Sequence, residues 1–194
     1  MKKIGLSLIT LLAANTLFAQ TSPLSYDYVG GSLGTGDVFE EDYSFYGLIG
    51  SKSINESFFV KGSWFDGSTD DDINFGIGSS KVENSGYALG VGYHMPFSAT
   101  ADFVVSASYL SSELELFGFS EKDDGYGVDA GVRFKATERL ELNAFAAYAD
   151  VGEGDMGWAV SGYYFLTPTF SVGGSYEDDG DELETVSGTV RFHF

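Results

Sequence analysis

The last nine residues of the chain constrain the fold most, because they alternate strictly and end on phenylalanine. One face would carry Val186, Gly188, Val190, Phe192 and Phe194, and the other would carry Ser187, Thr189, Arg191 and His193. Successive side chains of a β-strand point to opposite faces, so this segment is predicted to be a strand with one apolar face. An edge strand of a water-soluble sheet rarely ends on two exposed phenylalanines.

The same period-two pattern recurs along the rest of the chain, with few stretches of helical periodicity. Clear alternation occupies residues 57–67, 84–95, 101–113, 126–135, 140–148, 158–166 and 170–176, and weaker patterns cover 25–34 and 41–52. Together with the C-terminal strand, these segments predict an all-β, antiparallel up-and-down barrel of about ten strands, with eight as the alternative.

Alternation alone also describes a soluble sandwich or a lipocalin-type barrel. Two features favour a transmembrane barrel. Aromatic residues bound the apolar face at the strand ends, as a lipid-facing band with two girdles requires: Tyr87, Tyr93, Phe103, Tyr109, Tyr126 and Phe134. The opposite face consists of glycine, serine and charged residues, which would make a poor soluble core but a suitable wet lumen.

The N-terminus has the layout of a secretory signal peptide. Lys2 and Lys3 precede an apolar stretch from Ile4 to Ala14, and the small residue Ala19 stands just before Gln20. We therefore expect a cleaved signal peptide at residues 1–19 and a single barrel domain at 20–194. The absence of cysteine excludes a lipoprotein anchor and disulfides.

The connections between the predicted strands alternate between short and long, which orients the barrel. Short ones lie near residues 53–56, 96–100, 136–139 and 167–169, and long ones near 35–42, 66–83, 113–124, 150–157 and 177–184. An even number of strands then leaves both termini on the periplasmic side of the outer membrane of a Gram-negative bacterium.

The chain has a formal net charge of −19, and its acidic residues gather in the predicted long loops. A negative ring at the outer rim would repel phosphate backbones, which disfavours nucleic-acid binding. The ring could attract divalent cations that bridge to lipopolysaccharide, or enrich cations at a pore mouth. Alternatively, it is a repulsive surface that keeps the loops soluble.

A dedicated metal site is not predicted. Asp70, Asp72 and Asn74 have part of the spacing of an EF-hand loop, but Phe75 and Lys81 occupy the positions that need glycine and a bidentate acid. Weak binding of divalent cations, shared between loops, is expected at Asp70, Asp71, Asp72, Asp178, Asp179 and Asp181.

Several charged residues fall on the predicted inner face. A charge inside a barrel must be paired or hydrated. We expect a salt-bridge network that partly fills the lumen, formed by Asp27, Lys61, Asp129, Arg133, Lys135, Glu141 and Arg191. Whether the bore closes would depend on these side chains together with Tyr46, Phe65 and Tyr163.

The two histidines are poorly placed for catalysis. His94 and His193 should face inward near the periplasmic end, far from the acidic loops. Runs such as Gly90-Val91-Gly92 lie in strand patterns and are not phosphate loops. No catalytic residue and no cofactor is predicted, and the chain is not expected to be an enzyme.

The chain resembles the small Gram-negative outer-membrane β-barrel proteins that are grouped as porin-like and lack an assigned function. Residues 25–31, 87–93, 124–133 and 191–194 carry the resemblance, and Phe192 and Phe194 resemble the C-terminal signal read by the barrel-assembly machinery. The resemblance implies location and fold, with outer-membrane lipid and lipopolysaccharide as surroundings, and supplies no catalytic residues. The leading expectation is a structural or surface-interaction role in the cell envelope; a narrow cation-preferring channel and an adhesin-like barrel are the alternatives.

Overall fold

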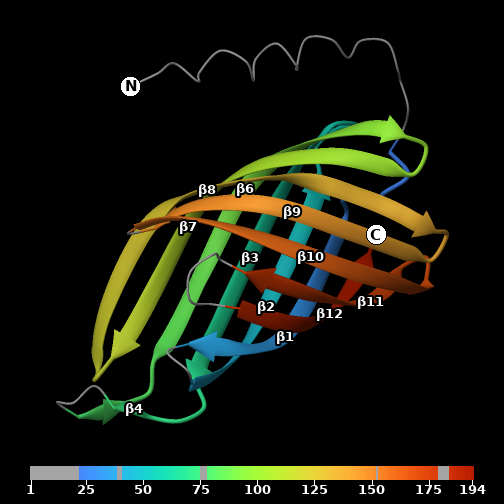
Figure 1. The fold of residues 1–194 in the computed structure, drawn as a ribbon. Helices are drawn as coiled ribbons and strands as arrows, with labels where there is room; N and C mark the ends of the chain where they lie inside the picture. The colour runs from blue at the N-terminus through green and yellow to red at the C-terminus, as the bar shows by residue number, and fades with distance from the viewer. Residues whose placement is uncertain (1–21, 39–40, 75–77, 152, 179–183) are drawn as a thin grey trace, which may run out of the picture.

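The computed structural model describes residues 22–38, 41–74, 78–151, 153–178 and 184–194. In these residues ten antiparallel strands close into one barrel, in the order β1-β12-β11-β10-β9-β8-β7-β6-β3-β2 (Figure 1). The strands are β1 (Tyr28–Val38), β2 (Glu41–Ser53), β3 (Phe58–Thr69), β6 (Glu83–Ser98), β7 (Ala101–Leu116), β8 (Phe119–Thr137), β9 (Leu140–Val151), β10 (Glu153–Thr167), β11 (Phe170–Asp178) and β12 (Glu184–His193). The prediction of ten strands is confirmed. A separate small hairpin joins β4 (Ile73–Asn74) to β5 (Ser79–Ser80).

The barrel closes between the first and last strands. β1 pairs with β12 from Tyr28 opposite His193 to Asp37 opposite Glu184. Every long strand therefore has two hydrogen-bonded neighbours, and no edge is left to pair with another chain. The alternation read from the C-terminal residues is the pattern of this closing strand.

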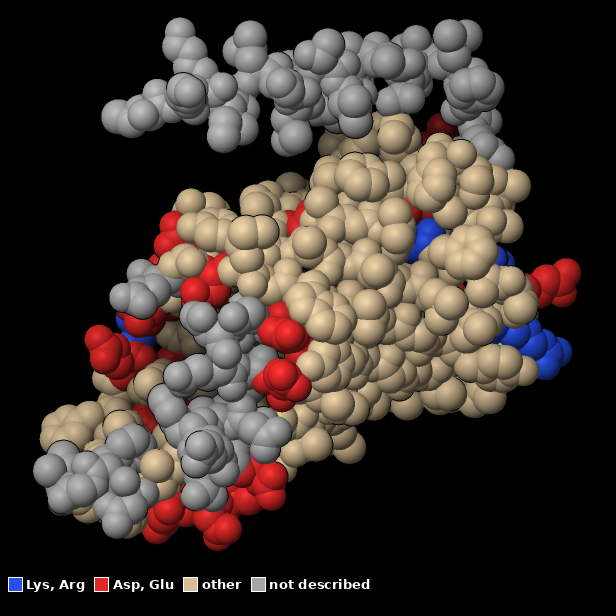
Figure 2. Space-filling view, in the orientation of Figure 1, with Lys and Arg blue, Asp and Glu red and all other residues tan. Residues whose placement is uncertain are grey.

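The two ends of the barrel differ, and we name them by their connections. The turn end holds the short connections that follow β2, β6, β8 and β10, as predicted, and the loop end holds the others. Carboxylates gather at the loop end in Figure 2, and a broad surface without charge separates them from the few charges at the opposite end.

Three of the acidic segments predicted as long loops are extensions of strands instead, including 35–42, where Asp37 pairs with Asp42 and Val38 with Glu41. The β7–β8 ladder continues up to Leu116 opposite Phe119, so that only Phe117 and Gly118 connect the two strands. Both connecting residues have positive φ, 52° and 74° respectively, as a two-residue hairpin turn requires. Across residue 152, Val151 of β9 likewise lies opposite Glu153 of β10. The predicted loops 113–124 and 150–157 are therefore mostly paired backbone.

The outer surface is apolar, as the alternation predicts. Large side chains stand exposed around the barrel, among them Val29, Leu48, Val60, Leu89, Val91, Val128, Leu142, Val160 and Phe192. The Tyr46 side chain also points outward and packs edge-on against Trp64, with ring centroids 5.6 Å apart. Tyr46 therefore lies outside the bore that it was expected to help close. The described residues include no helix long and apolar enough to cross a membrane.

Candidate functional site

A segment ahead of the first strand lies inside the barrel at the turn end. Leu24 and Tyr26 are almost fully buried and form the apolar core with Phe59 and Val104, against which Phe145 packs. We call residues 22–26 the N-terminal plug. The sequence pattern had predicted a strand from residue 25, but β1 begins only at Tyr28. A barrel of ten strands is too wide for its inward side chains alone to fill, so space remains for the plug in the lumen.

The carboxylate of Asp102 holds the plug from one side. Its Oδ2 atom accepts hydrogen bonds from Ser22 Oγ at 2.5 Å and from the Tyr26 hydroxyl at 2.9 Å, and His94 Nδ1 lies 3.3 Å away. Tyr26 also stacks on the His94 ring at 4.0 Å, with the two planes 15° apart. Asp102 is completely buried, so the donors to its Oδ2 atom replace part of the water that an ionised carboxylate would otherwise keep, while its Oδ1 atom has no hydrogen-bond partner among the described residues.

Arg133 holds the plug from the other side. Its Nη2 atom donates to the Ser25 carbonyl oxygen at 3.0 Å, and its guanidinium carbon lies 4.3 Å from the centre of the Tyr26 ring. The charge is balanced by Glu141, whose Oε1 atom accepts from Arg133 Nε at 3.0 Å and from Nη2 at 2.7 Å. The side chains of Arg133 and Glu141 are only 7% and 1% exposed. This ion pair lies beside the plug at the turn end, and we call this part of the barrel the floor of the lumen.

Two residues of the expected lumen network take no part in its ion pairs. Asp27 sits at the turn end, where its carboxylate accepts from Lys52 Nζ at 3.2 Å and from the Ser53 N–H at 2.6 Å. Although partial burial raises the pKa of Asp27, these hydrogen bonds outweigh that effect and hold the pKa below its ordinary value. Lys135 lines a cavity at the turn end, with Pro23, Glu138 and Pro168. Lys135 lies directly opposite Glu141 in the β8–β9 ladder, and Glu141 lines the same cavity, but no ion pair links their side chains among the described residues. Asp27 forms no ion pair with another network residue in the described ranges.

Lys61 and Asp129 form a second ion pair, nearer the middle of the lumen. Ser106 Oγ also donates to the Asp129 carboxylate, at 2.6 Å. This pair is wetter than the pair on the floor, since its side chains are 33% and 21% exposed. Five of the seven residues of the expected network thus form two separate ion pairs and the ring-covered Arg191, and not one connected network.

Arg191 differs from the other inward cations. Its guanidinium carbon lies 3.4 Å from the centre of the Tyr163 ring and 4.4 Å from that of Tyr28, so aromatic rings cover it from two sides. The residue is only 8% exposed. Within the described part of the chain, its guanidinium is within ion-pair distance of no carboxylate, and its Nε atom has no hydrogen-bond partner.

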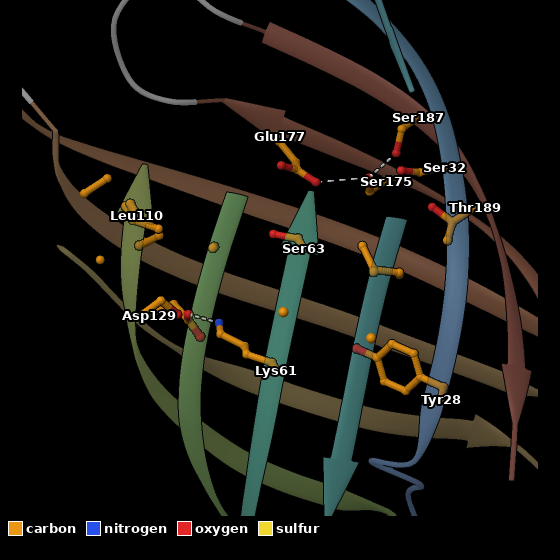
Figure 3. A pocket seen from close by; sticks show the side chains of 18 of the residues that line it. Tyr28, Ser32, Lys61, Ser63, Leu110, Asp129, Ser175, Glu177, Ser187 and Thr189 are labelled. Atoms are coloured by element: carbon orange, nitrogen blue, oxygen red, sulfur yellow. Dashed lines mark hydrogen bonds and ion pairs between the residues drawn. The ribbon is translucent and has the colours of Figure 1, made fainter. Parts of the chain in front are cut away.

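The lumen is hollow between the plug and the loop end. Two neighbouring cavities of about 430 and 370 Å³ share Tyr28, Lys61, Asp129, Tyr163 and Arg191 in their walls. Figure 3 shows hydroxyl-bearing side chains around this space, including Ser63, Ser175, Ser187 and Thr189, and the Lys61–Asp129 pair across it. Glu177 also faces the space and accepts a hydrogen bond from Ser175 at 3.2 Å. We call the two cavities together the vestibule.

The two histidines lie inside the turn end, as predicted. His94 belongs to the Asp102 cluster, and His193 Nε2 lies 2.9 Å from Ser171 Oγ. Ser171 is completely buried, and His193 Nδ1 has no hydrogen-bond partner among the described residues. A serine–histidine pair without an orienting acid and without access for a substrate lacks the geometry of a catalytic triad.

The acidic residues named as weak cation ligands are only partly described. Asp70, Asp71 and Asp72 lie between β3 and β4, where the Asp70 carbonyl oxygen accepts from Lys81 Nζ at 2.7 Å. Asp178 ends β11, and Asp179 and Asp181 lie outside the described residues. In the described ranges no group of three or more acidic, histidine or cysteine side chains could hold a metal ion.

Carboxylates also line a cavity of about 330 Å³ that the sequence had not singled out. Its walls include Asp66, Glu83, Glu113 and Glu115. By strand alternation these residues share the outward face with the aromatic residues Trp64, Tyr87 and Tyr109 on the same three strands. The acidic rim therefore extends onto the outer surface of the barrel, just beyond the aromatic girdle.

The sequence contained a signal for the plug that the strand count overlooked. Leu24 and Tyr26 alternate with Ser25 and Asp27, so they continue the period of β1 into a segment that has no strand partner. The contact of Asp102 with the plug had no local signal, because Ser22 and Tyr26, which donate to it, are 80 and 76 residues away in the chain.

A closed barrel with an apolar outer face and a polar interior is the architecture of a transmembrane β-barrel. Residues 4–185 match the family model described as the outer membrane protein beta-barrel domain. The chain belongs to this family, which places it in the outer membrane of Gram-negative bacteria. No curated protein matches it.

Solved structures share the fold at low sequence identity. The β domain of the Bordetella autotransporter BrkA aligns with a TM-score of 0.53 at 11% identity, covering 86% of this chain and 98% of that one. The KdgM porin in complex with disordered oligogalacturonate aligns with a TM-score of 0.51 at 11% identity, covering 86% and 99%. The NanC porin gives 0.50 at 11% identity, covering 84% and 98%. At such identity these likenesses establish the fold, which is porin-like, and assign no ligand.

Proposed function

We propose that this protein is an integral outer-membrane barrel that closes its own bore and serves a structural or surface-interaction role in the cell envelope, without enzymatic activity. The observation that carries the proposal is the N-terminal plug. Leu24 and Tyr26 fill the lumen between β3, β7 and β9, and Asp102 and Arg133 fix them from opposite sides. A lumen filled in this way has no continuous water path.

The turn end faces the periplasm in this proposal, with both termini on that side. Short connections at one end and acidic hairpins at the other support this orientation. The carboxylates just beyond the aromatic girdle then lie level with lipopolysaccharide phosphates, and divalent cations would bridge the two. Phe192 and Phe194, whose side chains are exposed, would meet the barrel-assembly machinery. The acidic rim disfavours nucleic acid as a partner.

Planar-bilayer conductance tests the closed bore. The mature protein, refolded in detergent and checked by heat-modifiable migration, is expected to give silent bilayers. The double variant Leu24→Ala and Tyr26→Ala removes the apolar plug and is expected to give discrete conductance steps. Ile54→Ala, in an exposed turn at the same end, is the matched control and should stay silent. Stable steps from the unaltered protein would contradict the proposal.

A narrow cation-preferring channel is the second candidate, and the vestibule and acidic rim favour it. It requires the plug to leave the lumen in the membrane. It predicts cation-selective steps from the unaltered protein, and these steps should shrink when Asp70, Asp71 and Asp72 are changed to Asn, because the local cation concentration at the mouth falls. Steps of unchanged size and selectivity in that variant would exclude a role for these three acids.

A further inference from the structure

The vestibule contains a buried cation that lies within ion-pair distance of no carboxylate among the described residues. Arg191 is less than one-tenth exposed, and Tyr163 and Tyr28 cover its guanidinium from two sides. Because rings occupy those sides, the N–H groups along its edge are the part left to bind another molecule. Its Nε atom is buried and has no hydrogen-bond partner among the described residues.

The carboxylates near Arg191 form their hydrogen bonds with other residues, although the charge of Glu141 also acts on Arg191. Glu141 accepts two hydrogen bonds from Arg133, and Asp129 binds both Lys61 and Ser106. Glu177 takes part in the hydrogen bond from Ser175. A desolvated cation that no carboxylate pairs is costly, so an anion that reaches Arg191 gains more there than it would at a hydrated surface.

The space beside Arg191 has the size and chemistry of a small-molecule site. Both cavities of the vestibule reach Arg191, and serine and threonine hydroxyls line their walls. Asn143, in the wall of the second cavity, has a buried Oδ1 atom without a hydrogen-bond partner in the described part of the chain. The plug closes the space on one side, so a bound molecule would be retained and not passed through.

We propose that the vestibule binds a small molecule carrying one carboxylate, which pairs with the edge of Arg191 between Tyr28 and Tyr163. A planar carboxylate matches the fork of donors that a guanidinium presents, and the hydroxyls would bind the rest of the molecule. The acidic rim limits how much negative charge the bound molecule can carry, because the rim repels polyanions more strongly than a compact monoanion or zwitterion. This site goes beyond the proposed envelope role, and it does not depend on whether the bore conducts.

Arginine side-chain NMR tests the site directly. The chain has only three arginines, Arg133, Arg139 and Arg191, so their Nε–H signals can be assigned by single substitution. Titration of the refolded mature protein with acetate is expected to shift the Arg191 signal and to saturate, with half-saturation at about 1–10 mM for so small a ligand. Acetamide, which has the same shape but no charge, should leave the signal unmoved.

The controls separate a built site from general ion effects. The acetate response should vanish in Arg191→Gln and persist in Arg139→Gln, an exposed residue of the turn end. Heat-modifiable migration checks that both variants are folded, and the titration of the unaltered protein needs no variant. A response that rises without saturation, or that acetamide reproduces, would mean an adventitious ion only and would overturn the proposal. A parallel titration with glycine identifies the class of ligand. If glycine binds more tightly than acetate, the site favours a zwitterion; if it binds more weakly, the site favours a simple carboxylic acid.

Discussion

The two halves of the lumen accommodate their charged side chains in opposite ways. At the turn end, charged side chains are fully enclosed and held by several hydrogen bonds, and the N-terminal plug fills the remaining space. In the loop-end half, the Lys61–Asp129 pair is partly hydrated, and the vestibule stays open beside it. Both halves are formed by the same ten strands, so the strand number alone does not decide whether the bore is closed. In the function proposed above, the residues ahead of the first strand decide it.

The largest effect should come from breaking the ion pair on the floor. Glu141→Gln leaves Arg133 buried without a counter-ion, which costs about 3–5 kcal/mol of stability. Urea unfolding of the refolded protein, followed by tryptophan fluorescence, would measure the loss. Glu138→Gln, an exposed acid of the neighbouring turn, should change stability little. Equal effects of the two substitutions would show that the floor is hydrated like the vestibule.

A smaller loss is expected from Asp102→Asn. Hydrogen bonds to a charged group contribute about 1.5–3 kcal/mol each, and the amide keeps part of them, so we expect a loss of about 2 kcal/mol. The substitution should also loosen the plug, because Ser22 and Tyr26 both bind this carboxylate. Limited proteolysis near residue 22 should accelerate, whereas Glu56→Gln, an exposed acid at the same end, should leave the rate unchanged.

The sequence predicted the strands well because the alternating pattern lies within the residues of each strand. The alternation in β8 or β12 is local, and closure of the barrel needs only that every strand find its neighbours. The prediction of loops was weaker for a related reason. Acidic composition was taken as a loop signal, although the Phe117–Gly118 turn lets the β7–β8 ladder continue beyond the membrane band.

The content of the lumen was harder to predict. Period two correctly placed Lys61, Asp129, Arg133, Glu141 and Arg191 on the inner face, but it could not say which strands stand across the barrel from one another. Arg133 and Glu141 pair on adjacent strands, whereas Lys61 reaches Asp129 across strands that are not neighbours. Asp27 was predicted to join the lumen network, but it pairs with Lys52 at the mouth of the barrel. The residues that enter the lumen are those just before Asp27 in the chain.

The vestibule pair should matter less than the pair on the floor. Asp129→Asn removes the partner of Lys61, but water already reaches both side chains and can hydrate the cation. We expect a loss of about 1 kcal/mol, within the range measured for partly exposed pairs. The same urea titration would detect it. A loss as large as that of Glu141→Gln would mean that the vestibule is drier than its exposed side chains indicate.

The smallest effect should come from Asp27, which lies outside both halves. Its pKa is lowered in the folded protein, so its contribution to stability is present above the unfolded-state pKa of about 3.9 and is lost as the pH falls through the lower folded-state value. Because the site is largely solvated, Asp27→Asn should cost at most about 1 kcal/mol at pH 7. The unaltered protein and the variant should converge in stability at pH values below the folded-state pKa of Asp27. A difference that persists there would show that the Ser53 N–H hydrogen bond, and not the charge of Asp27, fixes this mouth of the barrel.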